Sequence, residues 1–278
     1  MLDRSEYVEQ AYLFQLLRER IIEQIPLQEL LEQVQMELLV TTRLPMAVNY
    51  LLTELKHSGL LSPAVERLQH YFTPFQAFLI SEAEDETGRF DMRVALHVMQ
   101  ADAKFRSDAI TPAGLFLFQF EALCRNGLNY DRGLKAVAAD PQFDPAWQSW
   151  IGEVRNQVGF IDLADMIFLR SEEYLRLATQ AGQDVRDKPV ALFGEKEGRI
   201  AQANRRKDPT YLLSALQRHL NYPPVPRAIP VDTAKELLPQ MMRRMERLEA
   251  RLKLLEEEAR GGIDLSKFYV PPTDFAGS

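Results

Sequence analysis

Cysteine and long apolar runs are nearly absent from this sequence. Cys124 is the single cysteine among 278 residues, so no disulfide can form within one chain and a reducing compartment is favoured. No uncharged apolar stretch reaches the roughly 18–20 residues that a membrane-spanning helix needs. Asp3, Glu6 and Glu9 interrupt the first apolar residues, which argues against a secretory signal peptide. We therefore expect a cytoplasmic protein with no membrane span.

Positive charge is also in short supply. The chain has 33 lysines and arginines against 40 aspartates and glutamates, which gives a net charge of −7 at pH 7. This balance argues against DNA or an anionic membrane as the main ligand, because non-specific binding to either depends on positive charge. The hydrophobic share of 46% is nonetheless enough to build a core over this length.

Fingerprints of known catalytic sites are missing as well. The sequence contains no His-Glu-x-x-His helix, no Gly-x-Ser-x-Gly turn and no cysteine pair with zinc spacing. Cys124 follows an apolar segment and has no obvious histidine partner, which favours a buried structural thiol. We therefore expect no bound cofactor.

Signals for the start of a helix are abundant. A Ser, Thr or Asp followed by Pro suits the N-cap and the first helical position, because the cap accepts backbone N–H bonds and proline has no N–H to leave unpaired. Five such pairs occur, at Ser62-Pro63, Thr73-Pro74, Thr111-Pro112, Asp144-Pro145 and Asp208-Pro209. Asp3 and Glu6 have the spacing of a capping pair for a first helix. The pattern predicts an all-α fold, a multi-helix array or bundle with a C-terminal heptad helix.

Changes in composition divide the chain into four parts. We expect a helical body over 1–182, a connecting region over 183–230, a coiled-coil helix over 231–262 and a flexible tail over 263–278. Within the connecting region, Pro189, Gly194 and Gly198 interrupt the charged stretch 184–207, which predicts a long loop or hinge. A short helix over 209–220 and a stiff, proline-rich spacer are expected to follow.

A heptad repeat is the clearest pattern in the sequence. Apolar residues recur at alternating spacings of three and four, which is typical of a coiled-coil seam. The seam consists of Leu238, Met241, Met245, Leu248, Leu252, Leu255 and Ala259.

Charges beside the seam favour a parallel homodimer. In a parallel pair, Arg244 of one chain faces Glu249 of the other. Arg251 faces Glu256 in the same way. An antiparallel pair would bring Glu249 and Glu256 of the two chains together, and like charges repel. The alternative is that this short stripe docks on the body of its own chain, because three heptads make a helix of only about 30 Å.

Aromatic residues distinguish the tail that follows the heptads. Phe268, Tyr269 and Phe275 lie in a segment with little helical character. Such side chains are unfavourable in water. The tail therefore either folds back on the body or serves as an extended peptide for a partner.

A basic cluster stands out within this acidic chain. It consists of Arg199, Arg205, Arg206, Lys207 and Arg218. Guanidinium groups beside the expected start of a helix at Asp208 can hold a phosphate or an acidic partner. The alternative is a solvated face that pairs with the protein's own acids, such as the run Glu82, Glu84, Asp85 and Glu86.

Two Glu/His pairs form the best candidate for a metal site. Glu54 and His57 have the i,i+3 spacing found in four-helix carboxylate-bridged metal proteins. Glu66 and His70 lie one helical turn apart and could complete a site. The simpler interpretation of His57 is a cation that suits the C-terminal end of a helix near Gly59.

Two classes of function follow from these patterns. We favour a non-enzymatic interaction or adaptor protein, which self-associates through the parallel coil and binds an unknown protein partner. The alternative is a helical metal- or cofactor-binding enzyme with a site near Glu54 and His57.

Overall fold

The computed structural model describes residues 2–23, 26–85, 90–108, 110–157, 159–184 and 188–227, except for the side chain of Glu23. Residues 1–228 form one compact unit. The described residues form thirteen α-helices and a short 3-10 helix, with one isolated β-bridge and no strand. The expectation of an all-α array is therefore confirmed. The heptad seam and the aromatic tail lie outside the described residues.

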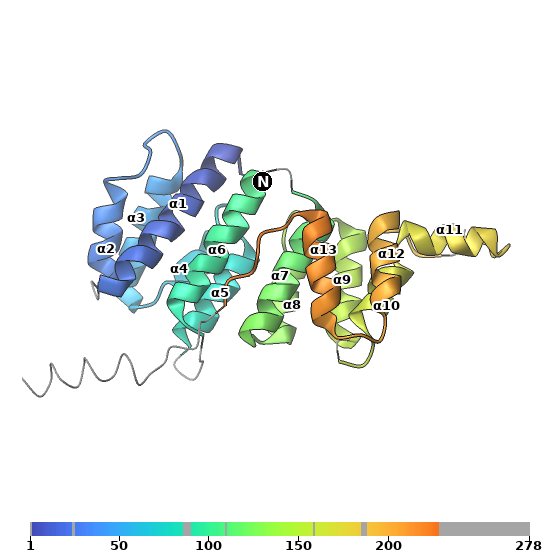
Figure 1. The fold of residues 1–278 in the computed structure, drawn as a ribbon. Helices are drawn as coiled ribbons and strands as arrows, with labels where there is room; N and C mark the ends of the chain where they lie inside the picture. Colours follow the sequence, from blue (N-terminus) through green and yellow to red (C-terminus); the bar gives the residue numbers. More distant parts are fainter. Residues whose placement is uncertain are drawn as a thin grey trace, which may run out of the picture. The chain divides into compact units, whose positions relative to one another are not determined.

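The first six α-helices pack side by side (Figure 1). Helix α1 packs mainly on α6, while α5 contacts both α4 and α6. Helices α2 and α3 contact each other and α1. The bounds are α1 Arg4–Arg20, η1 Ile21–Glu23, α2 Leu27–Gln35, α3 Leu44–Ser58, α4 Ser62–Arg67, α5 Pro74–Glu84 and α6 Met92–Ser107.

The array continues through α7 to α13. Helices α6 to α9 contact one another in sequence order, and α13 returns to pack on α7. Helix α12 contacts α10, α11 and α13. The bounds are α7 Pro112–Asn126, α8 Tyr130–Ala138, α9 Pro145–Gln157, α10 Leu163–Leu169, α11 Glu172–Gln180, α12 Glu195–Asn204 and α13 Pro209–Leu220. None of the described helices is both long and apolar enough to span a bilayer.

Most of the predicted helix starts are confirmed. At four of the five proline pairs the preceding side chain accepts a hydrogen bond from a backbone N–H of the first turn. These caps are Thr73, Thr111, Asp144 and Asp208. Thr73 also forms a full capping box with Gln76. Local side-chain chemistry therefore positions these helices.

Two predicted side-chain caps are wrong, the one at Ser62 and the one at the start of α1. At Ser62-Pro63 the carboxylate of Glu84 accepts hydrogen bonds from the backbone N–H groups of Leu61 and Ser62, with N–O distances of 2.6 and 2.9 Å. At the start of α1 neither Asp3 nor Glu6 makes the expected cap. Glu6 is buried and accepts hydrogen bonds from the backbone N–H of Arg43 and the hydroxyl of Tyr71, each at 2.9 Å.

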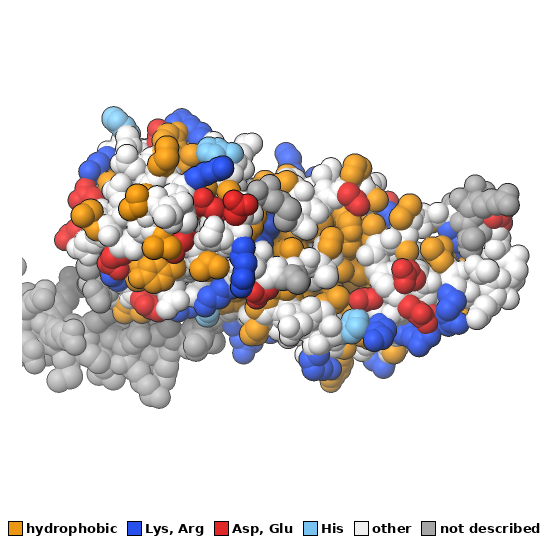
Figure 2. Space-filling view, turned by 90° about the horizontal axis from the view of Figure 1, so that it is seen from above, with side chains coloured by type: hydrophobic (Ala, Val, Ile, Leu, Met, Phe, Trp, Pro, Cys, Tyr) orange, Lys and Arg blue, Asp and Glu red, His pale blue; other side chains and the backbone are white. Residues whose placement is uncertain are grey.

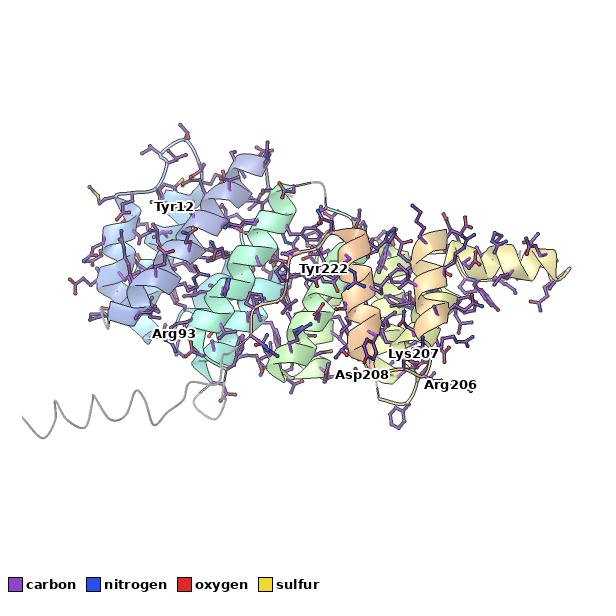
Figure 3. All side chains as sticks on the ribbon, viewed as in Figure 1. Tyr12, Arg93, Arg206, Lys207, Asp208 and Tyr222 are labelled. Carbon is purple, nitrogen blue, oxygen red and sulfur yellow. The ribbon has the colours of Figure 1, made fainter. Side chains whose placement is uncertain are left out.

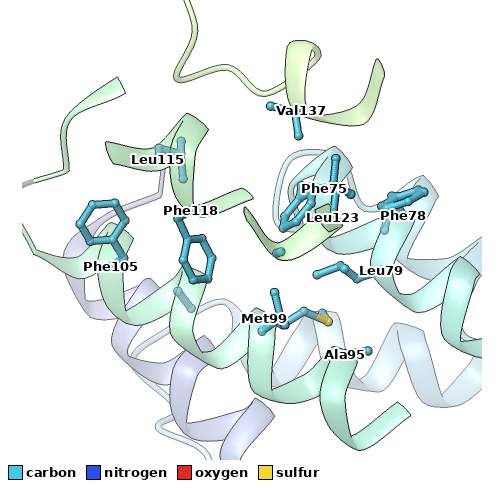
Figure 4. Close-up of a cluster of buried hydrophobic side chains, with 14 of the residues drawn as sticks. Phe75, Phe78, Leu79, Ala95, Met99, Phe105, Leu115, Phe118, Leu123 and Val137 are labelled. Atoms are coloured by element: carbon cyan, nitrogen blue, oxygen red, sulfur yellow. The ribbon is translucent and has the colours of Figure 1, made fainter. Parts of the chain in front are cut away.

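Apolar side chains from α5 to α8 fill the centre of the unit (Figure 4). Phe75 and Leu79 come from α5, Met99 from α6 and Phe118 from α7, and all four are almost fully buried. Val137 of α8 joins this core. Burial of this kind supplies most of the stability of a helical array.

A buried ionic group crosses the same core. Arg106 of α6 donates to Asp102 at 2.7 Å and also pairs with Asp140, which follows α8. All three side chains are at most 2% exposed. Burial raises the pKa of the Asp102 carboxyl, because desolvation outweighs the attraction of the Arg106 guanidinium. The group joins α6 to the α8–α9 connection.

The charged stretch 184–207 is not the expected loop, because it contains α12. Phe193 precedes this helix, and its ring centroid lies 5.2 Å from that of Trp147 and 5.1 Å from that of Trp150. The backbone N–H of Phe193 donates a hydrogen bond to the carbonyl of Arg170 at 3.0 Å. The backbone N–H of Glu172 donates one to the carbonyl of Phe193 at 2.9 Å. One buried aromatic side chain and these hydrogen bonds therefore hold the stretch on the body.

Gly198 lets α12 approach the connection between α10 and α11. A Cβ atom at this position would lie 2.3 Å from the Ser171 hydroxyl oxygen and 2.7 Å from the Cβ of Glu173. Both distances are far below van der Waals contact. A small residue is therefore required here, which explains why a glycine in mid-helix does not mark a hinge.

We expect Gly198→Ala to destabilise the protein by about 1–3 kcal/mol, because the added methyl group overpacks this contact. The measurement is the free energy of unfolding in urea. Gly152→Ala is the matched control, since nothing lies within 4 Å of a Cβ at that helical position. The control should be neutral or stabilising by up to about 1 kcal/mol. Equal stabilities of the two variants would contradict the close contact at Gly198.

The segment after α13 has no regular secondary structure over residues 222–227, and it is docked on the body. Tyr222 is buried, and its hydroxyl donates to the carboxylate of Glu121 at 2.7 Å. The side chain of Asn126 donates to the carbonyl of Pro226 at 3.1 Å. Residues 222–227 therefore lie along α7 instead of forming a free spacer.

Candidate functional site

A cleft of about 850 Å³ lies beside α7, the loop before α10 and the start of α13. Its walls combine aromatic, aliphatic and basic side chains. The residues that form it are Phe120, Cys124, Arg125, Tyr130, Gly159, Phe160, Ile161, Asp162, Leu163, Arg206, Lys207, Pro209, Thr210, Leu213 and Arg227. Figure 3 shows Arg206, Lys207 and Asp208 together at the end where α12 leads into α13.

Part of the lining is apolar, and some of its side chains are open to water. Phe120 is buried in the wall, whereas Tyr130 is partly exposed. Phe160 is 90% exposed and the adjacent Ile161 is 44% exposed. Large apolar side chains exposed beside a hollow are typical of a binding site.

Another part of the lining is basic. Arg206 and Lys207 come from the turn between α12 and α13, and Arg227 comes from the segment that follows Tyr222. Among the described residues, none of these three side chains has an acidic partner within ion-pair distance. Arg125 differs, because Glu121 of the same helix pairs with it. Three cations therefore face the cleft without an acidic partner in the described part of the chain.

Two acids at the start of α10 hold the turn that carries Arg206 and Lys207. The carboxylate of Asp162 caps α10 through the N–H of Ala164 at 3.0 Å and also accepts the backbone N–H of Arg206 at 2.8 Å. Arg205 pairs with Asp165 and lies over the ring of Phe168. The backbone of the turn is therefore fixed, while the side chains of Arg206 and Lys207 remain available.

Cys124 and Tyr130 are neutral groups in the apolar wall. The two side chains interact with each other. Burial raises the pKa of both the thiol and the phenol, because desolvation disfavours their charged forms. Both groups therefore stay protonated at neutral pH, and Cys124 lacks the thiolate character of a catalytic nucleophile.

The structure divides the predicted basic cluster. Arg199 pairs with Glu195 and lies 3.6 Å from Glu173, and Arg205 is paired as described above. Arg218 is exposed on α13 and does not line the cleft. Arg206 and Lys207 are the two members of the basic cluster that line the cleft. The acidic run proposed as their partner lies elsewhere, since Glu82 pairs with Arg132 at 3.0 Å.

The predicted metal candidates lie on the surface near the α3–α4 connection. Glu54 pairs with Arg67 at 2.8 Å, while His57, Glu66 and His70 are exposed. Within the described ranges, no group of three or more His, Cys, Asp or Glu side chains has the geometry to hold a metal ion. His57 stands in the last turn of α3, before Gly59.

Sequence patterns did not reveal most of the cleft. Phe120 and Tyr130 come from consecutive helices, and their ring centroids lie 6.3 Å apart. Arg227 lies far from both in the chain, and the packing of α13 and of the segment after it on α7 brings Arg227 to the cleft. Apart from the basic pair Arg206 and Lys207, the adjacent Phe160 and Ile161 give a local signal, because two large apolar residues follow Gly159 in a turn.

In comparisons with known proteins, no family model, curated protein or solved structure is significantly similar to this chain.

Proposed function

We propose that this chain is a non-enzymatic interaction protein, in which two copies pair through the seam that runs from Leu238 to Ala259. The main support is that the charges beside the apolar seam are complementary in a parallel pair. Arg244 and Arg251 stand where a parallel partner presents Glu249 and Glu256. We also propose a cytoplasmic location, since a single cysteine suits a reducing compartment.

An exposed apolar surface on the body supports a partner other than a second copy. The connection between α2 and α3 carries Met36 and Val40, which are 88% and 91% exposed. Glu9 accepts the N–H of Leu39 at 3.2 Å, so this connection is tied to α1. Exposed apolar side chains that lie close together are typical of protein-binding surfaces. Figure 2 shows one face of the molecule, on which charged and hydrophobic side chains are interspersed.

We expect Leu252→Asp to separate the paired chains. This leucine is at a seam position, so the substitution places two carboxylates in the apolar contact. The dissociation constant should rise at least about 100-fold, since removing the leucines and burying charge costs several kcal/mol. Light scattering on the full chain, with its mass followed over a dilution series, measures this change.

Leu254→Asp is the matched control, because Leu254 lies on the outer face of the same heptad. It should leave the mass of the wild-type dimer unchanged. A monomeric wild type, or equal effects of the two substitutions, would refute pairing through the seam. Circular dichroism of each variant verifies that the helical content of the body is retained.

Cross-linking distinguishes the parallel from the antiparallel arrangement. In a parallel pair the two copies of residue 252 face each other, so Leu252→Cys in a Cys124→Ser background should form a disulfide-linked dimer under mild oxidation. Leu254→Cys in the same background should not. A seam that pairs without this cross-link would contradict the parallel arrangement.

A further inference from the structure

We propose that the cleft beside α7 and α13 binds a small amphipathic organic anion, with an aromatic or aliphatic body against Phe120, Tyr130 and Phe160 and its carboxylate or phosphate at Arg206, Lys207 and Arg227. This inference goes beyond the pairing of two chains and does not depend on it.

The size and lining of the cleft suit a small molecule. Its volume of about 850 Å³ lies within the roughly 300–1,000 Å³ of typical ligand sites. Such sites are mostly apolar and carry a few polar groups that converge on one end of the ligand. Here Phe120, Leu163 and Leu213 belong to the apolar part of the lining, and Arg206, Lys207 and Arg227 are its basic groups.

The charge on the cleft specifies an anion. Arg206, Lys207 and Arg227 have like charges in one lining, and no acid of the described residues lies within ion-pair distance of them. Asp162 is the single acidic residue of the lining, and its carboxylate is already engaged by two backbone N–H groups. An anionic group on the ligand would compensate these like charges.

The backbone of the basic turn is arranged in advance for such a ligand. Arg206 has a φ of 58°, in the left-handed region that disfavours a side chain. The hydrogen bond from its N–H to Asp162 and the ion pair of Arg205 with Asp165 hold this conformation. The N–H of Lys207 donates to the carbonyl of Asn204 at 3.2 Å and closes this turn, so a fixed backbone presents the side chains of Arg206 and Lys207 in the lining of the cleft.

The neighbouring hollow does not share these properties. It has a volume of about 500 Å³ and lies between α5 and α8. Arg132, one of its two basic residues, pairs with Glu82 and donates to the hydroxyl of Ser81 at 3.0 Å. Lys135 is its other cation. This hollow therefore supplies a matched control for the charge of the cleft.

Calorimetric titration of the full chain with three probes tests the proposal. The probes are 2-naphthoate, its neutral analogue 2-naphthamide, and acetate, which has the charge without the apolar body. We expect 2-naphthoate to bind at least about tenfold more tightly than either of the other two, because the site requires both features. No binding of 2-naphthoate at millimolar concentration, or equal binding of the naphthamide, would overturn the proposal.

Substitutions then locate the probe. Arg206→Gln combined with Lys207→Gln should weaken 2-naphthoate binding at least about tenfold. Lys135→Gln, which removes a cation from the neighbouring hollow, should leave it unchanged. Loss of binding in the Lys135 variant alone would assign the probe to the other hollow and overturn the proposal. Equal urea midpoints of the variants and wild type exclude unfolding as the cause.

A further substitution tests the apolar half of the cleft without disturbing the core. Phe160 is 90% exposed, so Phe160→Ser should leave the protein folded. We expect it to weaken 2-naphthoate binding at least about fivefold, since the ring provides part of the apolar wall. Unchanged affinity in this variant and in the Arg206/Lys207 double variant would refute the site.

Discussion

Arg106→Met should destabilise the protein by about 3–5 kcal/mol, because it leaves Asp102 and Asp140 buried without their cation. The methionine side chain fills most of the volume of the arginine, so the loss reports the charge and not a cavity. Urea unfolding followed by circular dichroism measures it. Lys104→Met, two positions earlier on the same helix, is exposed and should change stability by less than about 0.5 kcal/mol.

The pH dependence of this variant has a definite sign. Burial already raises the pKa of Asp102 in the folded protein, and loss of Arg106 raises it further. A carboxyl whose pKa is raised on folding favours the folded state at low pH, and this contribution is lost as the pH rises through the folded pKa. The defect of Arg106→Met should therefore be largest near pH 8 and smaller at about pH 5. A defect that grows on acidification would contradict the buried-charge explanation.

Phe193→Ala should cost about 3–5 kcal/mol of stability, since it removes a buried ring that packs against both Trp147 and Trp150. The same substitution should alter tryptophan fluorescence in the folded protein, because Phe193 contacts both indoles. We also expect faster amide hydrogen exchange in α12, which follows Phe193 directly.

Val190→Ala is the control for this region. Val190 belongs to the same connecting segment but is 68% exposed, so its truncation should change stability by less than about 0.5 kcal/mol. If Phe193→Ala were as mild as Val190→Ala, the stretch 184–207 would behave as the hinge that its composition predicts. Fast exchange confined to residues before 192 would support the docked arrangement.

Helix caps show which expectations can be drawn from neighbouring residues. The pair Thr73-Pro74 predicts its helix correctly, because cap and capped N–H groups lie within one turn of each other. The start at Ser62 is different, because its cap is the carboxylate of Glu84, which lies 22 positions away. A cap supplied by another helix leaves no local pattern to recognise.

Glycine at position 198 illustrates the same limit. In a sequence a glycine within a charged stretch suggests flexibility, since glycine weakens a helix in isolation. In the structure this glycine permits close packing on Ser171 and Glu173. The two interpretations differ only in what lies opposite the glycine, and composition carries no information about that.

The sequence by itself determined the all-helical class and most of the helix starts, because these depend on periodicity and on caps within a few residues. It also carries the heptad seam, whose pairing is a proposal. Tertiary structure alone decided the position of α12, the burial of Arg106 with its two aspartates, and the cleft that Arg227 shares with Phe120. The reason is distance along the chain: the hydrogen bond that docks Tyr222 on Glu121 joins residues 101 positions apart, and no local pattern specifies such a contact.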